Sequence, residues 1–165
     1  MEVVGYTLLK KIIQPRALNS HKGDYGRLLL IGGTYPFGGA IIMAALAAVH
    51  SGAGLVTVAT DRENIAALHA HLPEAMAFDV QDKKLLSEQV QKADVVLIGP
   101  GLAESKLEKS VLQLVVELVS EHQVFIMDGG AISLFSQEAL PFSKSTDDFY
   151  PASKRVGAVE RTKDS

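Results

Sequence analysis

An uncharged stretch, residues 28–60, constrains the fold of this chain more than any other part of the sequence. It contains no Asp, Glu, Lys or Arg, and its length alone would be enough for a membrane-spanning helix. Glycines and a proline interrupt it near its start, however, and glycines at 52 and 54 interrupt it again. Three segments remain: an aliphatic run (28–31), an alanine-rich helical segment (40–50) and a second aliphatic run (55–59). This order is typical of a β-α-β unit whose strands are buried in a parallel sheet.

The same alternation of aliphatic runs and helical patterns continues along the chain. The expected strands are 27–31, 55–59, 95–98 and 124–127, with a weaker strand over 76–80. The expected helices are 6–13, 40–50, 64–71, 82–91 and 107–119, and residues 21–26 are expected to form a loop. Strands that alternate with helices predict an α/β fold with a mostly parallel sheet.

Composition excludes several classes of function. The formal net charge of the 165 residues is −3, which gives no reason to expect a nucleic acid or a membrane surface as partner. The chain has no cysteine, so neither a disulfide scaffold nor a thiolate zinc site is possible. Its five histidines form no cluster in the sequence, and no metal site is predicted. Because the first residues lack the order of a signal peptide, we expect a cytoplasmic protein.

Glycine-rich turns mark the expected ligand site. In parallel α/β sheets, ligands bind beyond the carboxyl ends of the strands, and Gly32-Gly33, Gly99-Pro100-Gly101 and Asp128 all fall there. Such a turn before a helix suits an anion or phosphate, although the glycines could equally serve only to make tight connections. The spacing is neither that of a dinucleotide fold nor that of a Walker A loop. Asp61 could bind a ribose hydroxyl, but the missing glycine fingerprint favours a helix cap.

Five sequence motifs in order resemble one known family. They are HKGDYGRLLLIGG, GGAIIMAALAAVHSGAGLVTVAT, PEAM, IGPGL and MDGGAI, and they resemble motifs of the NAD(P)H-hydrate dehydratases from about His21 to Leu134. The resemblance implies the N-terminal part of a ribokinase-like three-layer sandwich, the fold of carbohydrate kinases. It also implies a repair enzyme that removes water from the (S)-NAD(P)H hydrate, with ADP or ATP and Mg²⁺ as cofactors. The full-length family forms homo-oligomers.

The same resemblance implies a substrate site. Carried over by motif, Ala40 and Gly101 would line the hydrate site and Asp128 would lie at its floor. The turn residues that complete the expected site are Gly32, Gly33, Gly39 and Gly99. The resemblance assigns no catalytic residue and no metal ligand to this chain.

Two parts of the family pattern do not occur in this sequence. Family members are longer and carry a T-P-H-x-x-E motif, followed later by a Gly-Thr-Gly-Asp turn that supplies the catalytic aspartate and helps to build the nucleotide site. We therefore expect residues 1–141 to be the N-terminal part of such a domain, truncated after about residue 141 and inactive by itself. Residues 142–165 contain no Leu, Ile or Met. We expect them to be disordered and to pack on nothing.

Three interpretations of the function stay open from the sequence. The first is a truncated dehydratase. The second is a small nucleotide-binding module of Rossmann type, with Asp61 on a ribose. The third is a non-catalytic subunit that joins a partner through an unfinished sheet. A sugar kinase of the same fold is a weaker alternative, because the motifs match the dehydratases better.

The origin of the tail gives a testable prediction. Codons that are allowed for the residues from Phe142 onward, when read one base downstream, encode FPKAQMTFTPHQNEWERLKGLK. That peptide contains the missing T-P-H-x-x-E motif at the place where the family has it, although the wobble bases are a matter of choice. We expect sequencing of the gene to show a frameshift near codon 142, followed in the shifted frame by a Gly-Thr-Gly-Asp motif. An immediate stop codon in that frame would make the prediction wrong.

Overall fold

A computed structural model describes residues 5–6, 10, 15–137 and 150–151. Its strands are β1 (Arg27–Ile31), β2 (Leu55–Thr60), β3 (Met76–Asp79), β4 (Val95–Ile98), β5 (Val124–Met127) and β6 (Tyr150–Pro151). Its helices are the 3-10 helix η1 (Lys22–Tyr25), α2 (Gly38–His50), α3 (Arg62–His71), α4 (Lys83–Lys92), α5 (Lys106–Leu118) and α6 (Gly130–Gln137).

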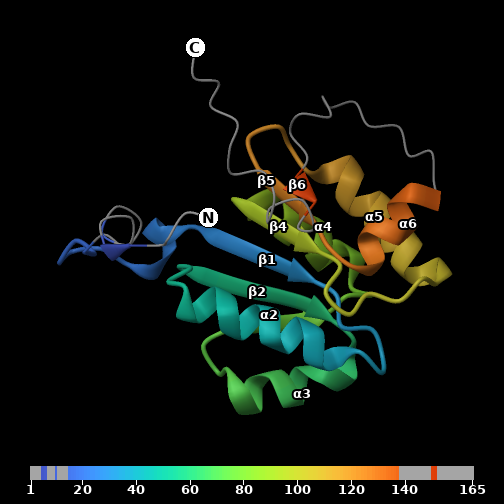
Figure 1. Ribbon diagram of the computed structural model, residues 1–165, viewed down its shortest axis with the longest axis horizontal. Helices are drawn as coiled ribbons and strands as arrows, with labels where there is room; N and C mark the ends of the chain where they lie inside the picture. Colours follow the sequence, from blue (N-terminus) through green and yellow to red (C-terminus); the bar gives the residue numbers. More distant parts are fainter. Residues whose placement is uncertain (1–4, 7–9, 11–14, 138–149, 152–165) are drawn as a thin grey trace.

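The strands form one parallel sheet in the order β3-β2-β1-β4-β5-β6. This confirms the expected α/β fold with a parallel sheet. The direction in which successive strands are added reverses at β1, because β2 and β3 lie on one side of it and β4 to β6 on the other (Figure 1). In open parallel sheets, such a reversal opens a crevice at the carboxyl ends of the two central strands. Here those strands are β1 and β4.

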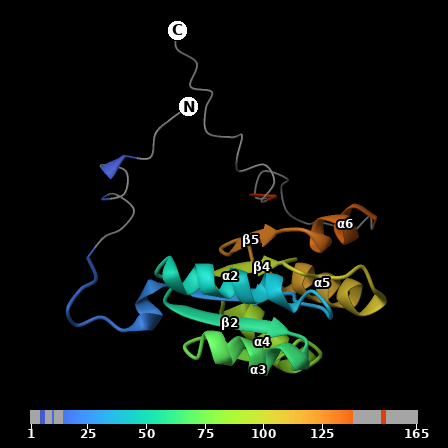
Figure 2. The same ribbon diagram turned by 60° about the horizontal axis from the view of Figure 1, so that its bottom comes forward.

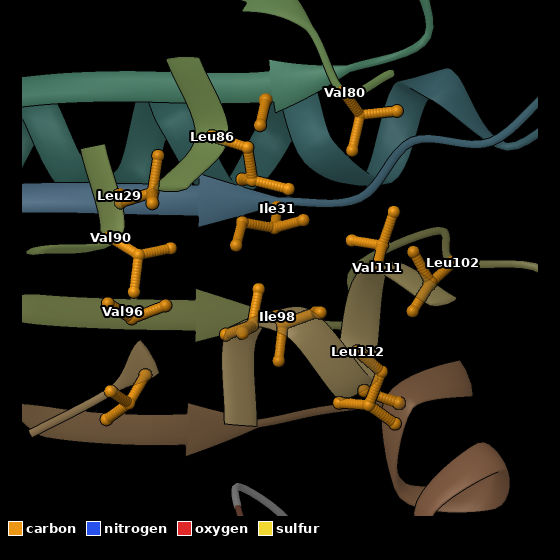
Figure 3. Close-up of a cluster of buried hydrophobic side chains, with 14 of the residues drawn as sticks. Leu29, Ile31, Val80, Leu86, Val90, Val96, Ile98, Leu102, Val111 and Leu112 are labelled. Carbon is orange, nitrogen blue, oxygen red and sulfur yellow. The ribbon is translucent and has the colours of Figure 1, made fainter. Parts of the chain in front are cut away.

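Two apolar cores separate the sheet from its helices, as a three-layer sandwich requires. Strand residues alternate between the faces, so Leu29 and Ile31 enter one core while Leu30 enters the other. The larger core packs α4, α5 and α6 on one face, and Figure 3 shows its side chains over strands whose arrowheads point the same way. The smaller core packs α2 and α3 on the opposite face. Figure 2 shows α3 at the β2 side of the molecule, and α6 contacts α5.

Helix α2 lies close against the sheet because its inward side chains are small or aliphatic. Ile41 and Ala45 are fully buried in the smaller core. The whole helix carries no Asp, Glu, Lys or Arg, so its outward side is apolar as well, and Met43 is 66% exposed there. A helix that is apolar all round is usually covered on both sides. None of the helices in the described ranges combines the length and the apolar character needed to cross a membrane.

The structure differs from the sequence-based expectations in three places. Residues 22–25, expected to be a loop, form η1, and residues 130–137 form α6, which was not expected. The expected helix over 6–13 lies largely outside the described residues. In the tail, Tyr150 and Pro151 pair with β5 in parallel, so the expectation that the tail packs on nothing does not hold at these two residues. The rest of the tail lies outside the described residues, and the domain boundary at 141 stays a prediction.

One part of the sheet stays outside both cores. Val124 and Ile126 alternate with the buried residues of β5 and therefore face the α2 side, and neither belongs to a core cluster. Val124 is 45% exposed. Exposed aliphatic side chains on a flat sheet face favour association with other chains.

We expect the protein to self-associate through this face, and Val124→Lys to weaken the association because it places a charge there. Analytical ultracentrifugation over a concentration series measures the effect. Gln91→Lys is the matched control, because Gln91 is exposed on α4 and the change in charge is the same. A cooperative monomer at every concentration would contradict the prediction.

Candidate functional site

Three turns pack together at the carboxyl edge of the sheet. The loop that joins β1 to α2 lies against the turn after β4, because Gly33 N donates to Pro100 O at 2.9 Å and Thr34 N donates to Gly101 O at 2.8 Å. The turn after β4 also packs against the turn after β5. A Cβ atom on Gly99 would stand 1.7 Å from Asp128 O, so only glycine allows this approach. The carboxyl edge of β1, β4 and β5 is therefore lined by closely packed backbone.

Ala40 and Gly101 meet at this edge of the sheet, although they are far apart in the sequence. Gly101 has a φ of +64°, and a Cβ atom on it would lie 2.3 Å from Phe37 O and 3.2 Å from Ala40 Cβ. The missing side chain thus lets the turn after β4 approach the first turn of α2. The structure brings together the two residues that the resemblance places in the substrate site.

Asp128 follows β5 directly and is partly buried. Its backbone is fixed, since Asp128 N donates to Ile98 O at 3.0 Å and Asp128 O accepts from Ala131 N at 3.1 Å. Its carboxylate makes no hydrogen bond to another described residue. Within the described ranges, the backbone N–H groups of Gly101 and Gly129 also lack an acceptor. This edge therefore includes one carboxylate and, among other groups, these two backbone donors without a protein partner in the described ranges.

The remaining predicted site residues occupy different positions. Gly32 and Gly33 are buried in the loop after β1, where Gly32 N donates to Ala59 O at 3.1 Å. Gly39 is exposed on the first turn of α2, and a Cβ atom there would meet nothing within 4 Å. The glycines of the loop thus shape the wall of the crevice, whereas Gly39 borders open space.

Side chains that were not expected at the site hold the loop from the β2 side. Asp61 Oδ2 accepts a hydrogen bond from Tyr35 N at 2.8 Å. Asn64 Nδ2 donates to Gly33 O, and also to Thr60 Oγ1 at 3.0 Å. Asp61 does occupy the N-cap position of α3, but its side chain makes no capping hydrogen bond. The interpretation of Asp61 as a side-chain cap is therefore wrong, because its carboxylate instead holds the glycine-rich loop, which is the segment 32–37 between β1 and α2.

A second set of polar side chains holds the loop from the α5 side. Glu108 is only 5% exposed, and its Oε1 accepts from Thr34 Oγ1 at 3.0 Å. Its Oε2 accepts from the Ser105 hydroxyl. Thr34 Oγ1 accepts in turn from Ala103 N at 3.2 Å. The sequence carried a signal for this arrangement, because Ser105 and Glu108 have the S-x-x-E spacing of a capping box.

An open hollow lies on the other side of the glycine-rich loop. Its lining consists of Tyr35, Asp61, Arg62, Glu63, Asp79 and Gln81. In a Rossmann-type module, an acid at this place binds a ribose hydroxyl. Here Tyr35 N occupies one oxygen of Asp61, so the carboxylate has a structural partner.

The described residues do not build a metal centre. No group of three His, Cys, Asp or Glu side chains among them is placed to hold an ion. The described residues therefore supply no all-protein cage for the Mg²⁺ that the family resemblance implies.

Comparisons with known proteins agree with the resemblance. The sequence matches the NAD(P)H-hydrate dehydratase family over residues 28–149. The ADP-dependent (S)-NAD(P)H-hydrate dehydratase of Streptococcus pneumoniae is 59% identical over 145 residues, which are 88% of this chain and 50% of that protein. The chain thus spans about half the length of the curated relatives that it matches.

Solved structures show the same relationship at the level of the fold. A ribokinase-like superfamily protein of Enterococcus faecalis is 42% identical with a TM-score of 0.79, covering 84% of this chain and 50% of that one. The ADP/ATP-dependent NAD(P)H-hydrate dehydratase of Bacillus subtilis, co-crystallised with ATP/Mg²⁺, is 27% identical with a TM-score of 0.62, covering 76% of this chain and 44% of that one. The chain therefore has a ribokinase-like fold that covers about half of these longer proteins, and it belongs to the NAD(P)H-hydrate dehydratase family.

Proposed function

We propose that this chain supplies the hydrate-binding half of an NAD(P)H-hydrate dehydratase and does not catalyse the dehydration alone. The observation that carries the proposal is the approach of Gly101 to Ala40, where a Cβ atom on Gly101 would lie 3.2 Å from Ala40 Cβ. This approach occurs at the crevice where the strand order reverses, which is the usual ligand position in open parallel sheets.

The chemistry of this edge suits the polar end of a hydrated nicotinamide. The N–H groups of Gly101 and Gly129 can donate to its carboxamide or hydroxyl oxygen, and the Asp128 carboxylate can accept from an N–H or O–H of the ligand. Charge that develops on the ligand would be met by backbone donors that are already in position. Binding and orientation are thus the part of the reaction that the described residues can perform.

The cofactors of the family belong to a different part of the domain in this proposal. ADP dependence is named for the Streptococcus pneumoniae relative, and ATP/Mg²⁺ for the Bacillus subtilis structure. No three metal-ligating side chains of the described residues lie together, and the sequence lacks the Gly-Thr-Gly-Asp turn. We therefore assign the nucleotide to the half of the relatives that this chain does not match.

A role in binding a partner is a second candidate. It is favoured by the exposure of Val124 on a sheet face outside both cores, and the occupant that we propose is another copy of this chain. The association measured for Val124→Lys tests this role separately from ligand binding.

Gly39 offers a direct test of the hydrate site. Because Gly39 borders open space on α2, Gly39→Leu should keep the fold and even gain up to about 1 kcal/mol in helix propensity. If the hydrate binds at the first turn of α2, the new side chain should weaken binding at least about tenfold, since one lost contact of about 1.4 kcal/mol is a factor of ten. NMR titration with hydrated NADPH measures this affinity.

The matched control for Gly39→Leu is Ala47→Leu. Ala47 is exposed two turns further along the same helix, and a leucine there should leave the affinity unchanged. Equal affinity of both variants and the unmodified protein would place the ligand elsewhere. Shifts confined to another face of the molecule would have the same meaning.

Turnover gives an independent test. We expect purified protein with ADP or ATP and Mg²⁺ to leave hydrated NADPH unchanged, because the catalytic aspartate of the family motif is absent from the sequence. Recovery of NADPH absorbance reports the reaction, and a longer relative from Streptococcus pneumoniae serves as the positive control. Nucleotide-dependent dehydration by this chain would overturn the proposal that it is inactive.

A further inference from the structure

Thr34 joins the two loops that form the proposed hydrate site. Its N–H donates to Gly101 O at 2.8 Å, and its carbonyl accepts from Phe37 N at 2.6 Å, directly before α2. Its hydroxyl accepts from Ala103 N at 3.2 Å and donates to Glu108 Oε1 at 3.0 Å. Three of these bonds cross from the loop after β1 to the segment that follows β4, so the position of Thr34 sets how the two loops stand relative to each other.

Glu108 fixes the orientation of the Thr34 hydroxyl. An ionised carboxylate can only accept hydrogen bonds, so the Thr34 proton points to Oε1 and a lone pair is left for Ala103 N. The other oxygen of the carboxylate accepts from the Ser105 hydroxyl, whose own oxygen accepts from Leu107 N at 3.2 Å. Each hydroxyl thus donates one hydrogen bond and accepts another. In a buried site, the hydrogen bonds of such a chain strengthen one another.

Capping of helix α5 does not by itself explain why Glu108 is buried. A capping-box glutamate reaches back to the backbone of the N-cap residue, whereas Glu108 is 5% exposed and reaches across to another loop. A buried carboxylate is costly unless every oxygen has a partner. The geometry therefore favours a role for Glu108 at the loop rather than only at the helix end.

We propose that Glu108 is a positioning residue of the hydrate site: through the Thr34 hydroxyl, its buried carboxylate fixes the first turn of α2 against Gly101. The identity of the ligand rests on the proposed function, but the placement of Ala40 against Gly101 does not. Glu108 acts on the site through Thr34.

The variants that test this are conservative in size. Thr34→Val replaces the hydroxyl with a methyl group, and Thr34→Ser restores the hydroxyl. Glu108→Gln keeps one acceptor oxygen but cannot accept at both positions. Glu117→Gln is the matched control, since Glu117 is exposed on the same helix.

The first measurement uses the ligand-free protein. We expect Thr34→Val to raise amide hydrogen exchange at Ala103 by about tenfold, as the loss of one hydrogen bond allows, and to shift the NMR resonances of Ala40 and Gly101. Thr34→Ser and Glu117→Gln should do neither. Because Glu108 and Thr34 act through one bond, Glu108→Gln should shift the same resonances, and the double variant should add little to either single one.

Thermal unfolding separates positioning from stability. If Thr34→Val and Glu108→Gln lower the unfolding temperature but leave the Ala40 and Gly101 resonances unchanged, the network is only structural and the proposal is wrong. If Thr34→Ser returns the Ala40 and Gly101 resonances to their positions in the unmodified protein, the positioning role is supported.

The second measurement adds hydrated NADPH. We expect Thr34→Val to weaken binding by about tenfold and Thr34→Ser to restore it. If the unmodified protein binds no hydrate, the proposed function fails, while the ligand-free measurement still decides the role of Glu108. If the unmodified protein and Thr34→Val bind the hydrate equally well, the function stands and the positioning role is refuted.

Discussion

The pairing of β1 with strands on both sides is the constraint on which the remaining structure depends. Leu29 lies opposite Thr57 of β2 and opposite Val96 of β4, both in parallel register. Parallel neighbours must be joined by crossovers, and these place helices on the sheet faces. Because α2 follows β1 on one face and α5 follows β4 on the other, the chain separates at the carboxyl ends of these two strands. The position of the candidate site at this reversal is a consequence of the topology before any side chain is considered.

Much of this fold could be predicted from the sequence, for physical reasons that differ between elements. The strands of the uncharged stretch were predictable because aliphatic runs between glycines have few other stable arrangements. Helix α6 was not, because GAISLFSQ contains no charged residue and so has no strongly polar face to mark a helical period. The order of the strands also lies beyond a single sequence, since each aliphatic run could pair with any other.

The candidate site was predictable in its backbone and not in its side chains. Glycine turns at strand ends point to the carboxyl edge, and the resemblance supplied Ala40, Gly101 and Asp128. The roles of Asp61 and Glu108 depend on which loop lies beside each carboxylate in space. For Asp61 the local pattern of a helix start suggested a cap, yet the partner lies 26 residues earlier. Sequence spacing carries no information on such a contact.

The glycine-rich loop is held by side chains from three different elements: Asp61 at the end of β2, Asn64 on α3 and Glu108 on α5. Glycines in a loop often suggest a mobile cover that closes over a bound molecule. This loop instead has its backbone tied to both neighbouring strand ends, so it behaves as a fixed wall. For a ligand in the proposed site, we therefore expect release to be governed by its contacts with this wall rather than by the opening of the loop.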